Sequence, residues 1–558
     1  MPYGDDNRAA DLDLASRDPA LPGLRILFVP SAFAAALGRV LPGTIEAVRP
    51  AYVRYKPGMN CLVSYRVETD NGTHEVYAKA YRNADREKLQ KAVCRGSFSL
   101  DQHVVASIFP VDAKLKSLGR LSDERNRTRL LRRLLPECPE LWSGDVRELR
   151  YKPERRYVAR LEVDGRPVAA LKFFTSLGYG AASAGARAFR SGASVRVPDR
   201  LGRSRKHQVL AYEWLHGALL SDRLTDGGCS ADDFRRVGVA LAELHGQAAE
   251  TLPRIGQDLE CARLTEVAAA IGLLHPGLAA RVDVLAGRLG RSLGGLEPVM
   301  SPIHGDFYAK QVLLRADGVG VLDFDESALG DPASDLGNFI AHLERDELRG
   351  RIGTAEAQRA SDALVEGYAR AADVPSMGRD RLYTARCLFA LAPHPFRFRE
   401  ANWPAATAKL VERCRELLDA ERDPRPVPRR GCGSRRAARR ARRIPVEDRF
   451  GIRSDPALPF IAGALEADLV EERLRQFCDR LGGAGSVLAL RQIRVLRHKP
   501  GRRCLIEYEL DVARPGHPSG QLALIGKVRA RGLDAKTYSL CGRLWRTGFG
   551  DASADRIS

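Results

Sequence analysis

Two short segments near the middle of the chain constrain its fold more than any other feature. Residues 304–311 read HGDFYAKQ, and residues 321–325 read VLDFD. Between them lie an apolar stretch at 312–314 and a turn at 316–320, which together predict a tight antiparallel hairpin. The two ends of such a hairpin lie side by side, so we expect the polar residues that flank it to meet in one pocket.

These flanking residues are three carboxylates and one amide, namely Asp306, Gln311, Asp323 and Asp325. No cluster of His or Cys ligands accompanies them, so the set suits a hard, oxygen-preferring cation, Mg²⁺ above all. A magnesium ion beside a carboxylate that can accept a proton is the equipment of phosphoryl transfer. The alternative is a polar hairpin on the surface of a soluble domain, and the agreement of order, spacing and residue type argues against it.

The same residues resemble the aminoglycoside phosphotransferase and choline kinase-like family, whose members have a protein-kinase-like fold. That family carries H-G-D-x-x-x-x-N and, later, a hydrophobic residue followed by D-[FW]-[DE]. The resemblance implies that Asp306 is the catalytic base and that Gln311, Asp323 and Asp325 surround the magnesium ions on ATP. Gln311 departs from the family's Asn, and its amide oxygen lies one methylene further from the backbone.

The resemblance also implies a site for the nucleotide. Lys172, in the strand-like run VAALKFF, is the expected contact to the ATP phosphates. The apolar run at 207–220 is expected to connect the two lobes and, near Glu213 and Leu215, to present backbone groups to adenine.

Two features of the family are missing around Lys172. PERR at 153–156 stands where a glycine-rich phosphate loop is expected, so Arg155 or Arg156 either covers the phosphates by charge or lies in a surface turn. Kinases pair this lysine with a Glu from the next helix, and the chain contains no Glu between Lys172 and the connector at 207–220.

An internal repeat predicts how the chain is organised. RYKPG at 54–58 recurs as RYKPE at 150–154 and as RHKPG at 497–501. Each copy is followed by a strand-like run and then by a second such run that contains a lysine. A kinase-like N-terminal lobe begins with the same series of three strands. The three lysines are Lys79, Lys172 and Lys527.

We therefore expect an α+β chain, with a two-lobed protein-kinase-like fold and additional N-lobe-like modules before and after it. The expected parts are a tail at 1–16, an accessory module at 17–142, the kinase N-terminal lobe at 143–206, the C-terminal lobe with a helical acceptor subdomain at 207–424, an Arg-rich linker at 425–454 and a second, truncated N-lobe-like module at 455–558.

The first module offers Lys79 and, on a predicted helix at 85–93, Glu87. We interpret this module as an inactive copy that either buttresses the kinase lobe or lends a carboxylate to its site. For the module at 455–558 three interpretations stay open: a truncated second kinase, a remnant of gene fusion, or a free-standing accessory domain.

Local signals predict helices in the C-terminal lobe. Ser230 and Asp233 resemble a capping box ahead of an apolar stripe that ends near His245. We expect His245 to pack or to form hydrogen bonds rather than to bind a ligand. Asp331 is expected to cap a second helix, and Asp335 to place negative charge in its first turn.

Bulk composition excludes several classes of protein. A chain of 558 residues with 44% hydrophobic and 28% charged residues is globular, with roughly three or four domains. Its eleven Cys are scattered, which argues against a zinc ribbon or a disulfide scaffold and favours a reducing cytoplasm. No apolar stretch of about 18 residues predicts a membrane span, and the acidic N-terminus is unlike a secretory signal.

The net charge of +19 raises the possibility of a nucleic-acid partner. Nine arginines and no acid lie in the stretch 425–443, which reads as a solvated linker rich in Pro, Gly and Ala. The linker could bind nucleic acid without specificity. Because no aromatic residues are interleaved with the basic ones, we rank a nucleic-acid function last.

The leading interpretation is an ATP-dependent phosphotransferase that acts on a hydroxyl of a sugar, an amino alcohol or an aminoglycoside-like molecule. Residues 357–420, the expected acceptor region, contain no acidic run, so an aminoglycoside acceptor is not favoured. The alternative is a pseudokinase or scaffold that binds nucleotide without efficient turnover.

Overall fold

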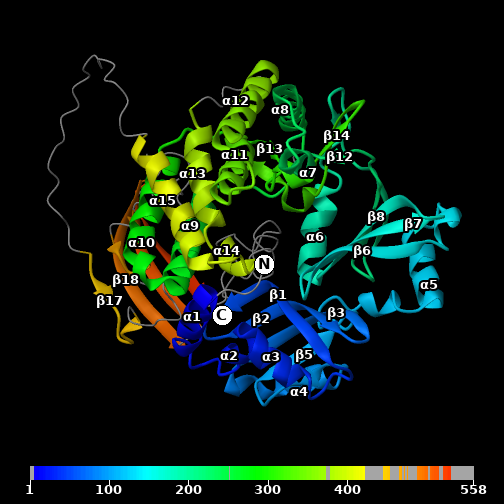
Figure 1. Cartoon of the computed structure of the whole chain (residues 1–558). Helices are drawn as coiled ribbons and strands as arrows, with labels where there is room; N and C mark the ends of the chain where they lie inside the picture. Colours follow the sequence, from blue (N-terminus) through cyan, green and yellow to red (C-terminus); the bar gives the residue numbers. More distant parts are fainter. Residues whose placement is uncertain are drawn as a thin grey trace. The chain divides into compact units, whose positions relative to one another are not determined.

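The computed structural model describes most of the chain up to residue 420 and parts of the remainder. The described residues form two compact units that divide at residue 427, and together they are a mixed α+β protein, as expected (Figure 1). The described ranges are 5–249, 252–372, 378–420, 444–452, 464–467, 470–471, 474, 487–499, 503–513 and 520–529.

The first unit begins with three helices and a five-stranded antiparallel sheet, blue in Figure 1. The strand order is β1-β2-β3-β5-β4, and β3 carries Lys79. One face of the sheet is apolar and packs on α2 and α3, where Phe33 stacks on Tyr65 with 3.7 Å between ring centroids. The elements are α1 (Asp5–Ser16), α2 (Leu24–Phe28), α3 (Pro30–Leu37), β1 (Ile45–Lys56), β2 (Asn60–Thr69), β3 (Gly72–Tyr81), α4 (Arg86–Val93), β4 (Phe98–Ser99) and β5 (Val104–Ile108).

A second five-stranded sheet, cyan in Figure 1, has the same topology. Its order is β6-β7-β8-β11-β10, so in both sheets the fifth strand lies between the third and the fourth. Its third strand carries Lys172 and, as in the first sheet, is followed by a helix. The elements are α5 (Glu124–Leu134), β6 (Asp145–Lys152), β7 (Arg156–Val163), β8 (Arg166–Phe174), α6 (Ser176–Gly185), β10 (Arg200–Ser204) and β11 (Val209–Glu213).

In three separate sheets the repeated KP motif ends the first of three consecutive antiparallel strands, and it does so in the same register. In each sheet the motif lysine pairs with the residue four positions later, as Lys56 pairs with Asn60. The lysine of the third strand always pairs with the residue six positions after the motif lysine. These pairs are Leu62 with Lys79, Val158 with Lys172 and Leu505 with Lys527.

The structure corrects two of the expected boundaries. Residues 5–16 of the expected tail form α1, whose Leu14 is buried and whose Asn7 side chain donates to the Glu400 carbonyl oxygen at 3.0 Å. Residues 115–142, expected to belong to the first module, pack instead on the second sheet. The cause is the apolar face of α5, which offers Leu130, Leu131 and Leu134 to that sheet.

The connector and the hairpin join the second sheet to the helical part of the unit. After β11, residues 214–217 lead into β12 (Ala218–Leu219), which pairs with β14 of the hairpin. The hairpin consists of β14 (Val312–Arg315) and β15 (Gly318–Val321), and β9 (Val195–Arg196) pairs with β15. Its turn is the two residues 316–317, shorter than the predicted turn at 316–320, because residues 318–320 already pair in β15.

The remainder of the first unit is largely helical, as predicted for residues 357–420. The capping box of Ser230 and Asp233 is confirmed at the start of α8, which packs on α12, while α11 packs on α13. Within the described residues no helix is both long and apolar enough to cross a membrane. The further elements are α7 (Leu220–Thr225), α8 (Ala231–His245), α9 (Gln257–Leu274), α10 (Ala279–Gly294), β13 (Ser301–Ile303), β16 (Ala328–Gly330), α11 (Ala333–Leu348), α12 (Thr354–Ala371), α13 (Asp380–Leu391), α14 (His394–Arg397) and α15 (Trp403–Ala420).

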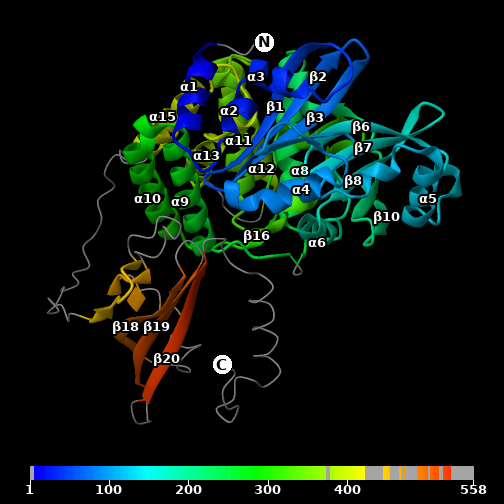
Figure 2. The same ribbon diagram turned by 90° about the horizontal axis from the view of Figure 1, so that it is seen from below.

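The second unit contains one four-stranded sheet, whose long strands appear side by side in Figure 2. The order is β17-β18-β19-β20, and the three long strands pair in antiparallel fashion. The arginines predicted to form the linker at 425–443 and much of the predicted module at 455–558 lie outside the described residues. The strands are β17 (Val446–Glu447), β18 (Val487–Lys499), β19 (Arg503–Ala513) and β20 (Gly520–Arg529).

Candidate active site

Hydrogen bonds draw the two ends of the hairpin together. The Nε2 atom of His304 lies 2.8 Å from the carbonyl oxygen of Leu322, and the Leu322 amide donates to the carbonyl oxygen of Gln311 at 2.8 Å. Gln311 lies on a 3₁₀ turn, Ala309–Gln311, directly before β14. The segment with Asp306 and the segment with Asp323 are therefore neighbours, as the spacing of the motifs predicted.

The buried carboxylate of Asp335 fixes the first of these segments. It accepts hydrogen bonds from the backbone amides of His304 at 2.7 Å and of Gly305 at 2.9 Å, and it lies 3.0 Å from Nε2 of His245. Burial alone would raise the pKa of Asp335, but the hydrogen bond from His245 and the amide donors hold it below its usual value. His245 is held in turn by the Tyr368 hydroxyl at 2.8 Å, so it forms hydrogen bonds as predicted.

Gly305 occupies a backbone position that other residues would strain. Its φ is +83°, and a Cβ atom there would overlap the carbonyl oxygen of Glu326. The residue that follows, Asp306, then faces a cavity. Burial, helped by the nearby carboxylates of Asp323 and Glu326, raises the pKa of Asp306 to about 7, against the lowering influence of Lys152 and Arg156.

Asp323 and Asp325 form a buried cluster with two cations. Lys172 Nζ lies 2.6 Å from Asp323 Oδ1 and 3.2 Å from Asp325 Oδ1, and Arg156 Nη1 lies 3.0 Å from Asp323 Oδ1 and 2.5 Å from Asp325 Oδ2. Burial opposes ionisation of Asp323, but Lys172 and Arg156 outweigh it and hold its pKa far below normal. The pKa of Asp325 rises to about 6, because burial and the charge of Asp323 outweigh the same cations. Asp323 itself has a φ of +69°, a strained conformation of the kind that clusters at functional sites.

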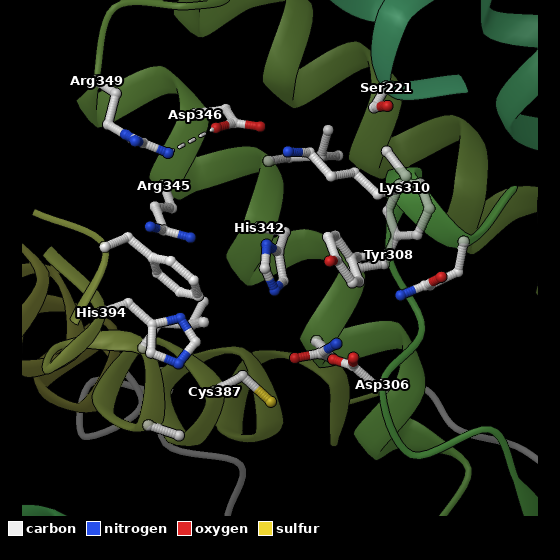
Figure 3. A pocket seen from close by; sticks show the side chains of 18 of the residues that line it. Ser221, Asp306, Tyr308, Lys310, His342, Arg345, Asp346, Arg349, Cys387 and His394 are labelled. Carbon is white, nitrogen blue, oxygen red and sulfur yellow. Dashed lines mark ion pairs between the residues drawn. The ribbon is translucent and has the colours of Figure 1, made fainter. Parts of the chain in front are cut away.

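A cavity of about 450 Å³ opens beside Asp306 (Figure 3). Gln311 and Arg156 line it next to Asp306, and helices α11 and α13 supply much of the opposite wall. Inside it the rings of Tyr308 and His342 stack with 4.1 Å between their centroids. Asp306 therefore borders a cavity of the size that binds small molecules, and it lies near enough to Asp323 and Arg156 for their charges to act on it.

Comparison with known proteins agrees with this geometry. Residues 116–383 match the phosphotransferase enzyme family (APH). This region belongs to the phosphotransferase family. The resemblance inferred from the sequence is therefore confirmed, although the matched residues begin and end earlier than the kinase lobes expected at 143–424. The first sheet and the sheet of the second unit lie outside the matched region.

Three of the solved structures that match this chain are the following. A choline/ethanolamine kinase family protein from Mesorhizobium loti is 18% identical, with 53% of this chain and 95% of that chain covered and a TM-score of 0.39. A thermostable mutant of aminoglycoside phosphotransferase APH(4)-Ia in a ternary complex with ADP and hygromycin B is 17% identical, with 51% and 96% covered and a TM-score of 0.38. Macrolide 2'-phosphotransferase MphH from Brachybacterium faecium is 20% identical, with 48% and 91% covered and a TM-score of 0.34. No curated protein matches the chain significantly.

Lys172 has no Glu partner on the helix that follows it, and its carboxylate partners come from another segment. In the described structure the carboxylates paired with Lys172 are those of Asp323 and Asp325, and α6 contains no acid. The helix also lies very close to these aspartates, since a Cβ atom at Gly185 would overlap the carbonyl oxygen of Phe324. The lysine is therefore anchored by the hairpin segment instead of by its following helix.

Of the residues expected to contact adenine, Glu213 ends β11 and Leu215 lies on the connector that follows it. The side chain of Leu215 reaches β15, where its Cδ1 atom lies 3.5 Å from the position that a Cβ of Gly320 would take. The backbone amide of Glu213 donates to the carbonyl oxygen of Asp199 at 2.8 Å, so that amide already has a partner. Of these two residues, Glu213 is exposed and Leu215 is half-buried.

The donor set suits a metal only if the substrate supplies further ligands. Within the described residues no group of three or more His, Cys, Asp or Glu side chains is placed to hold a metal by itself. Asp323 and the buried Gln311 nevertheless offer one carboxylate and one amide oxygen in neighbouring segments. Mg²⁺ is commonly held by one or two carboxylates, with phosphates and waters completing its octahedron, so these residues fit.

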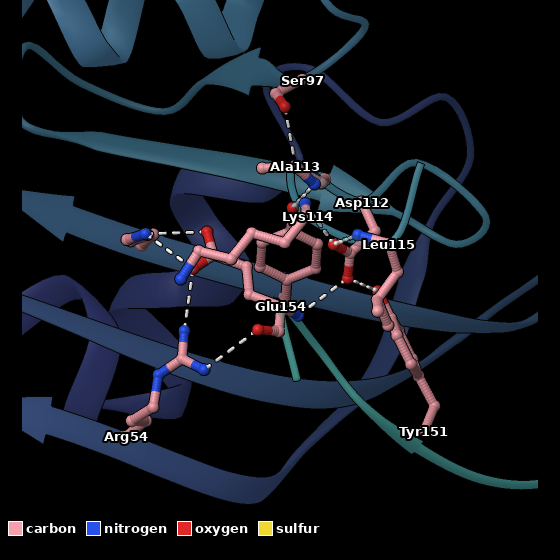
Figure 4. Close-up of polar contacts among 11 residues, drawn as sticks. Arg54, Ser97, Asp112, Ala113, Lys114, Leu115, Tyr151 and Glu154 are labelled. Atoms are coloured by element: carbon pink, nitrogen blue, oxygen red, sulfur yellow. Dashed lines mark hydrogen bonds and ion pairs between the residues drawn. The ribbon is translucent and has the colours of Figure 1, made fainter. Parts of the chain in front are cut away.

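The corresponding lysine of the first sheet, Lys79, has a partner that the sequence did not suggest, namely Glu154, which Figure 4 shows with Arg54, Lys114 and Asp112 around it. Lys79 Nζ lies 2.7 Å and 2.8 Å from the two carboxylate oxygens of Glu154, which also pairs with Arg54 at 2.8 Å and Lys114 at 3.2 Å. Burial alone would raise the pKa of Glu154, but Lys79 and the other two cations hold it below normal. Asp112 completes the contact by accepting the Glu154 backbone amide at 2.8 Å.

We expected the first module either to buttress the kinase lobe or to lend a carboxylate to its site. In this contact the kinase lobe instead supplies a carboxylate to the lysine of the first module. Glu87 does not reach Lys79; its side chain is 87% exposed and pairs with Lys91 at 3.5 Å. The carboxylate comes instead from the second sheet, from the turn where a glycine-rich loop would lie. Glu154 takes a φ of +55° there, close to the +60° of Gly58 at the same position of the first repeat. A strained backbone thus carries a buried ion pair between the two sheets.

We predict that Glu154→Ala will destabilise the protein by about 3–5 kcal/mol, because it leaves Lys79 charged and buried without a partner. The measurement is the denaturant midpoint of the full chain, followed by tryptophan fluorescence. Lys79→Met in the Glu154→Ala background should recover part of the loss. The matched control is Glu87→Ala, for which the exposed side chain predicts a change within about 0.5 kcal/mol. Equal effects of the two Glu→Ala changes would contradict the role of Glu154.

Proposed function

We propose that the chain is an ATP-dependent phosphotransferase that moves the γ-phosphoryl group of ATP to a hydroxyl of a small molecule, with a two-lobed kinase-like site. The observation that carries this proposal is the position of Asp306, which lines a small-molecule cavity and follows a loop hydrogen-bonded to the segment of Asp323 and Asp325. Membership of residues 116–383 in the phosphotransferase family supports the same reaction.

The cationic and the acidic side chains have different proposed roles. Lys172 and Arg156 are the cations nearest to the carboxylate pair, and they would contact the phosphates of the nucleotide. Asp323 and Gln311, with Asp325 beside them, would hold Mg²⁺, which neutralises charge on the phosphates when bound. The ion pairs of Lys172 and Arg156 with the aspartates keep all four charged groups ordered before the nucleotide binds.

The transfer step assigns one role to Asp306. Its carboxylate accepts the proton of the acceptor hydroxyl, whose oxygen forms a bond to the γ-phosphorus of ATP. The bond between that phosphorus and the β–γ bridging oxygen breaks, and ADP leaves. A pKa near 7 suits a general base that works at neutral pH, because the group is then available as a base and still holds a proton well.

A nucleotide-binding scaffold without turnover is the second candidate. Lys172 and Arg156 are both engaged with the carboxylates that would bind the metal, and these contacts would also stabilise an inactive site. The two candidates differ in whether the wild-type chain transfers phosphoryl groups, and only the phosphotransferase requires Asp306 for that transfer.

We predict that Asp306→Asn will lower phosphoryl transfer by at least about a hundredfold, since general base catalysis contributes roughly 10²–10⁴ to rates. Binding of Mg·ATP, followed by calorimetry, should stay within about threefold of the wild-type value. Asp222→Asn, an exposed change on the neighbouring helix α7, serves as the control and should leave both quantities unaltered. ATP binding with no turnover in the wild-type chain, over a broad panel of alcohols, would favour the scaffold.

The raised pKa of Asp306 predicts how the rate depends on pH. Only the carboxylate form accepts a proton, so activity should rise with pH and level off above a midpoint no higher than about 7. A bound cation would move the midpoint lower but not higher. The test is kcat/KM for the acceptor between pH 5 and 9 at saturating Mg·ATP. The rise of kcat/KM with pH should persist in the Lys152→Met variant. A kcat/KM that falls steadily between pH 5 and 9 would contradict the assignment of Asp306 as the general base.

A further inference from the structure

We propose that the acceptor is an anionic alcohol, a small molecule that carries a phosphate or carboxylate group in addition to the hydroxyl that is phosphorylated. This inference rests on the proposed function, because it assigns the acceptor to the cavity beside Asp306. It is carried by the charges that line that cavity.

Positive side chains outnumber negative ones around the cavity. Eight Arg and Lys residues line it, against the three acids Asp306, Asp346 and Glu400. Two of the eight are neutralised by carboxylates that do not line the cavity. Arg156 pairs with Asp323 and Asp325, and Arg386 pairs with Glu260 at 2.6 Å. Six cations therefore remain to be balanced by three acids.

Three of these six share two carboxylates. Arg345 and Arg349 both pair with Glu400, at 2.5 Å and 3.1 Å, and Arg351 pairs with Asp346 at 3.3 Å. Arg345 is 92% buried, and among the residues that the structure describes its Nε atom has no hydrogen-bond partner. A buried donor of a charged group that lacks a partner is costly unless a ligand supplies an acceptor.

The other three, Arg150, Lys152 and Lys310, have no carboxylate within ion-pair distance in the part of the chain that the structure describes. Lys152 instead lies over the ring of Phe398, with Nζ 5.9 Å from the centroid. Burial, together with the neighbouring arginines, lowers the pKa of Lys152 to about 7 and lowers that of Lys310 as well. Cationic side chains that lower one another's pKa in this way would be stabilised by a bound anion.

The cations and the base lie around one cavity, so a single molecule could contact both. Figure 3 shows Lys310, Arg345 and Arg349 around the space that Asp306 also borders. Arg345 and Arg349 are presented by α11 and its C-terminal end, and Lys310 by the turn that follows Asp306. An anionic group held by these side chains would leave the hydroxyl of the same molecule at Asp306. A polycationic acceptor would meet the repulsion of the same charges.

The test uses the full chain with saturating Mg·ADP, so that the phosphate contacts of the nucleotide are occupied. Calorimetry measures binding of inorganic phosphate and of alcohols in matched sets: glycerol, glycerate and glycerol 3-phosphate, and glucose, gluconate and glucose 6-phosphate. Kanamycin is the polycation. We expect at least one anionic member to bind about tenfold or more tightly than its neutral parent, and kanamycin not to bind. Whether the phosphate or the carboxylate member binds identifies the anionic group.

Lys310→Ala should weaken binding of the anionic alcohol about tenfold, because it removes a cation of the cavity lining that forms no ion pair with another described residue. Lys91→Ala, a change on the surface helix α4 away from the cavity, is the matched control and should bind as the wild-type chain does. Both variants should show the wild-type melting temperature.

The inference is overturned if no anion binds, if the neutral parents bind as tightly as the anions, or if Lys310→Ala binds as the wild-type chain does. The proposed function has a separate readout, which is ADP formation from Mg·ATP with the bound alcohols. Anionic alcohols that bind through Lys310 without any phosphoryl transfer would contradict the proposed function and leave the anion site in place. Transfer to neutral alcohols alone would support the function and overturn the anion site.

Discussion

The site depends on the buried carboxylate of Asp335. Its two amide hydrogen bonds set the path of His304 and Gly305, and the third partner, His245, keeps it ionised and oriented. Hydrogen bonds to an ionised acceptor are stronger than neutral ones, and burial makes the loss of any of them costly. Because His304 in turn bonds to the carbonyl of Leu322, the position of Asp323 follows from the same anchor.

Both repeat lysines in the first unit are held by carboxylates that come from outside their own sheets. Lys172 is paired with two aspartates of the hairpin segment, and Lys79 with Glu154 of the neighbouring sheet. Under the proposed function, the first pairing keeps these cations and carboxylates where phosphates and a metal would bind. The second satisfies Lys79 with a protein side chain, so the first sheet is suited to support rather than to bind a nucleotide.

Helix α1 also contacts the segment that forms part of the wall of the cavity. Asn7 of α1 donates to the backbone of Glu400, whose carboxylate pairs with Arg345 and Arg349. On the same helix, Asp11 pairs with Arg399 and accepts from the indole of Trp403 at 3.2 Å. The segment that carries Glu400 is thus fixed by residues nearly four hundred positions earlier in the chain, which gives α1 a role that its sequence did not indicate.

The features that could be predicted from the sequence are those that depend on residues close together in the chain or on the internal repeat. The hairpin, the capping box at Ser230 and the lysine of each third strand follow from local order and from the repeat. Three features could not be predicted in this way, because they depend on distant residues. In the sequence, Asp335 indicates only a negative charge in the first turn of a helix. Its contact with the backbone of His304 forms only in the folded chain. Glu154 stands where the other two repeats have glycine, and its partner is 75 residues away. The basic lining of the cavity is assembled from segments that lie far apart in the sequence, around residues 150–156, 310 and 345–351.

The most direct test of the account is the position of a divalent ion in a crystal of the full chain grown with Mn²⁺ and a non-hydrolysable ATP analogue. Anomalous diffraction should locate Mn²⁺ within about 2.3 Å of a carboxylate oxygen of Asp323. The amide oxygen of Gln311 should face the same ion, and the Lys172 ammonium should contact the phosphates of the analogue. An ion bound elsewhere, or an analogue that leaves the pairs of Lys172 and Arg156 with the aspartates intact, would contradict it.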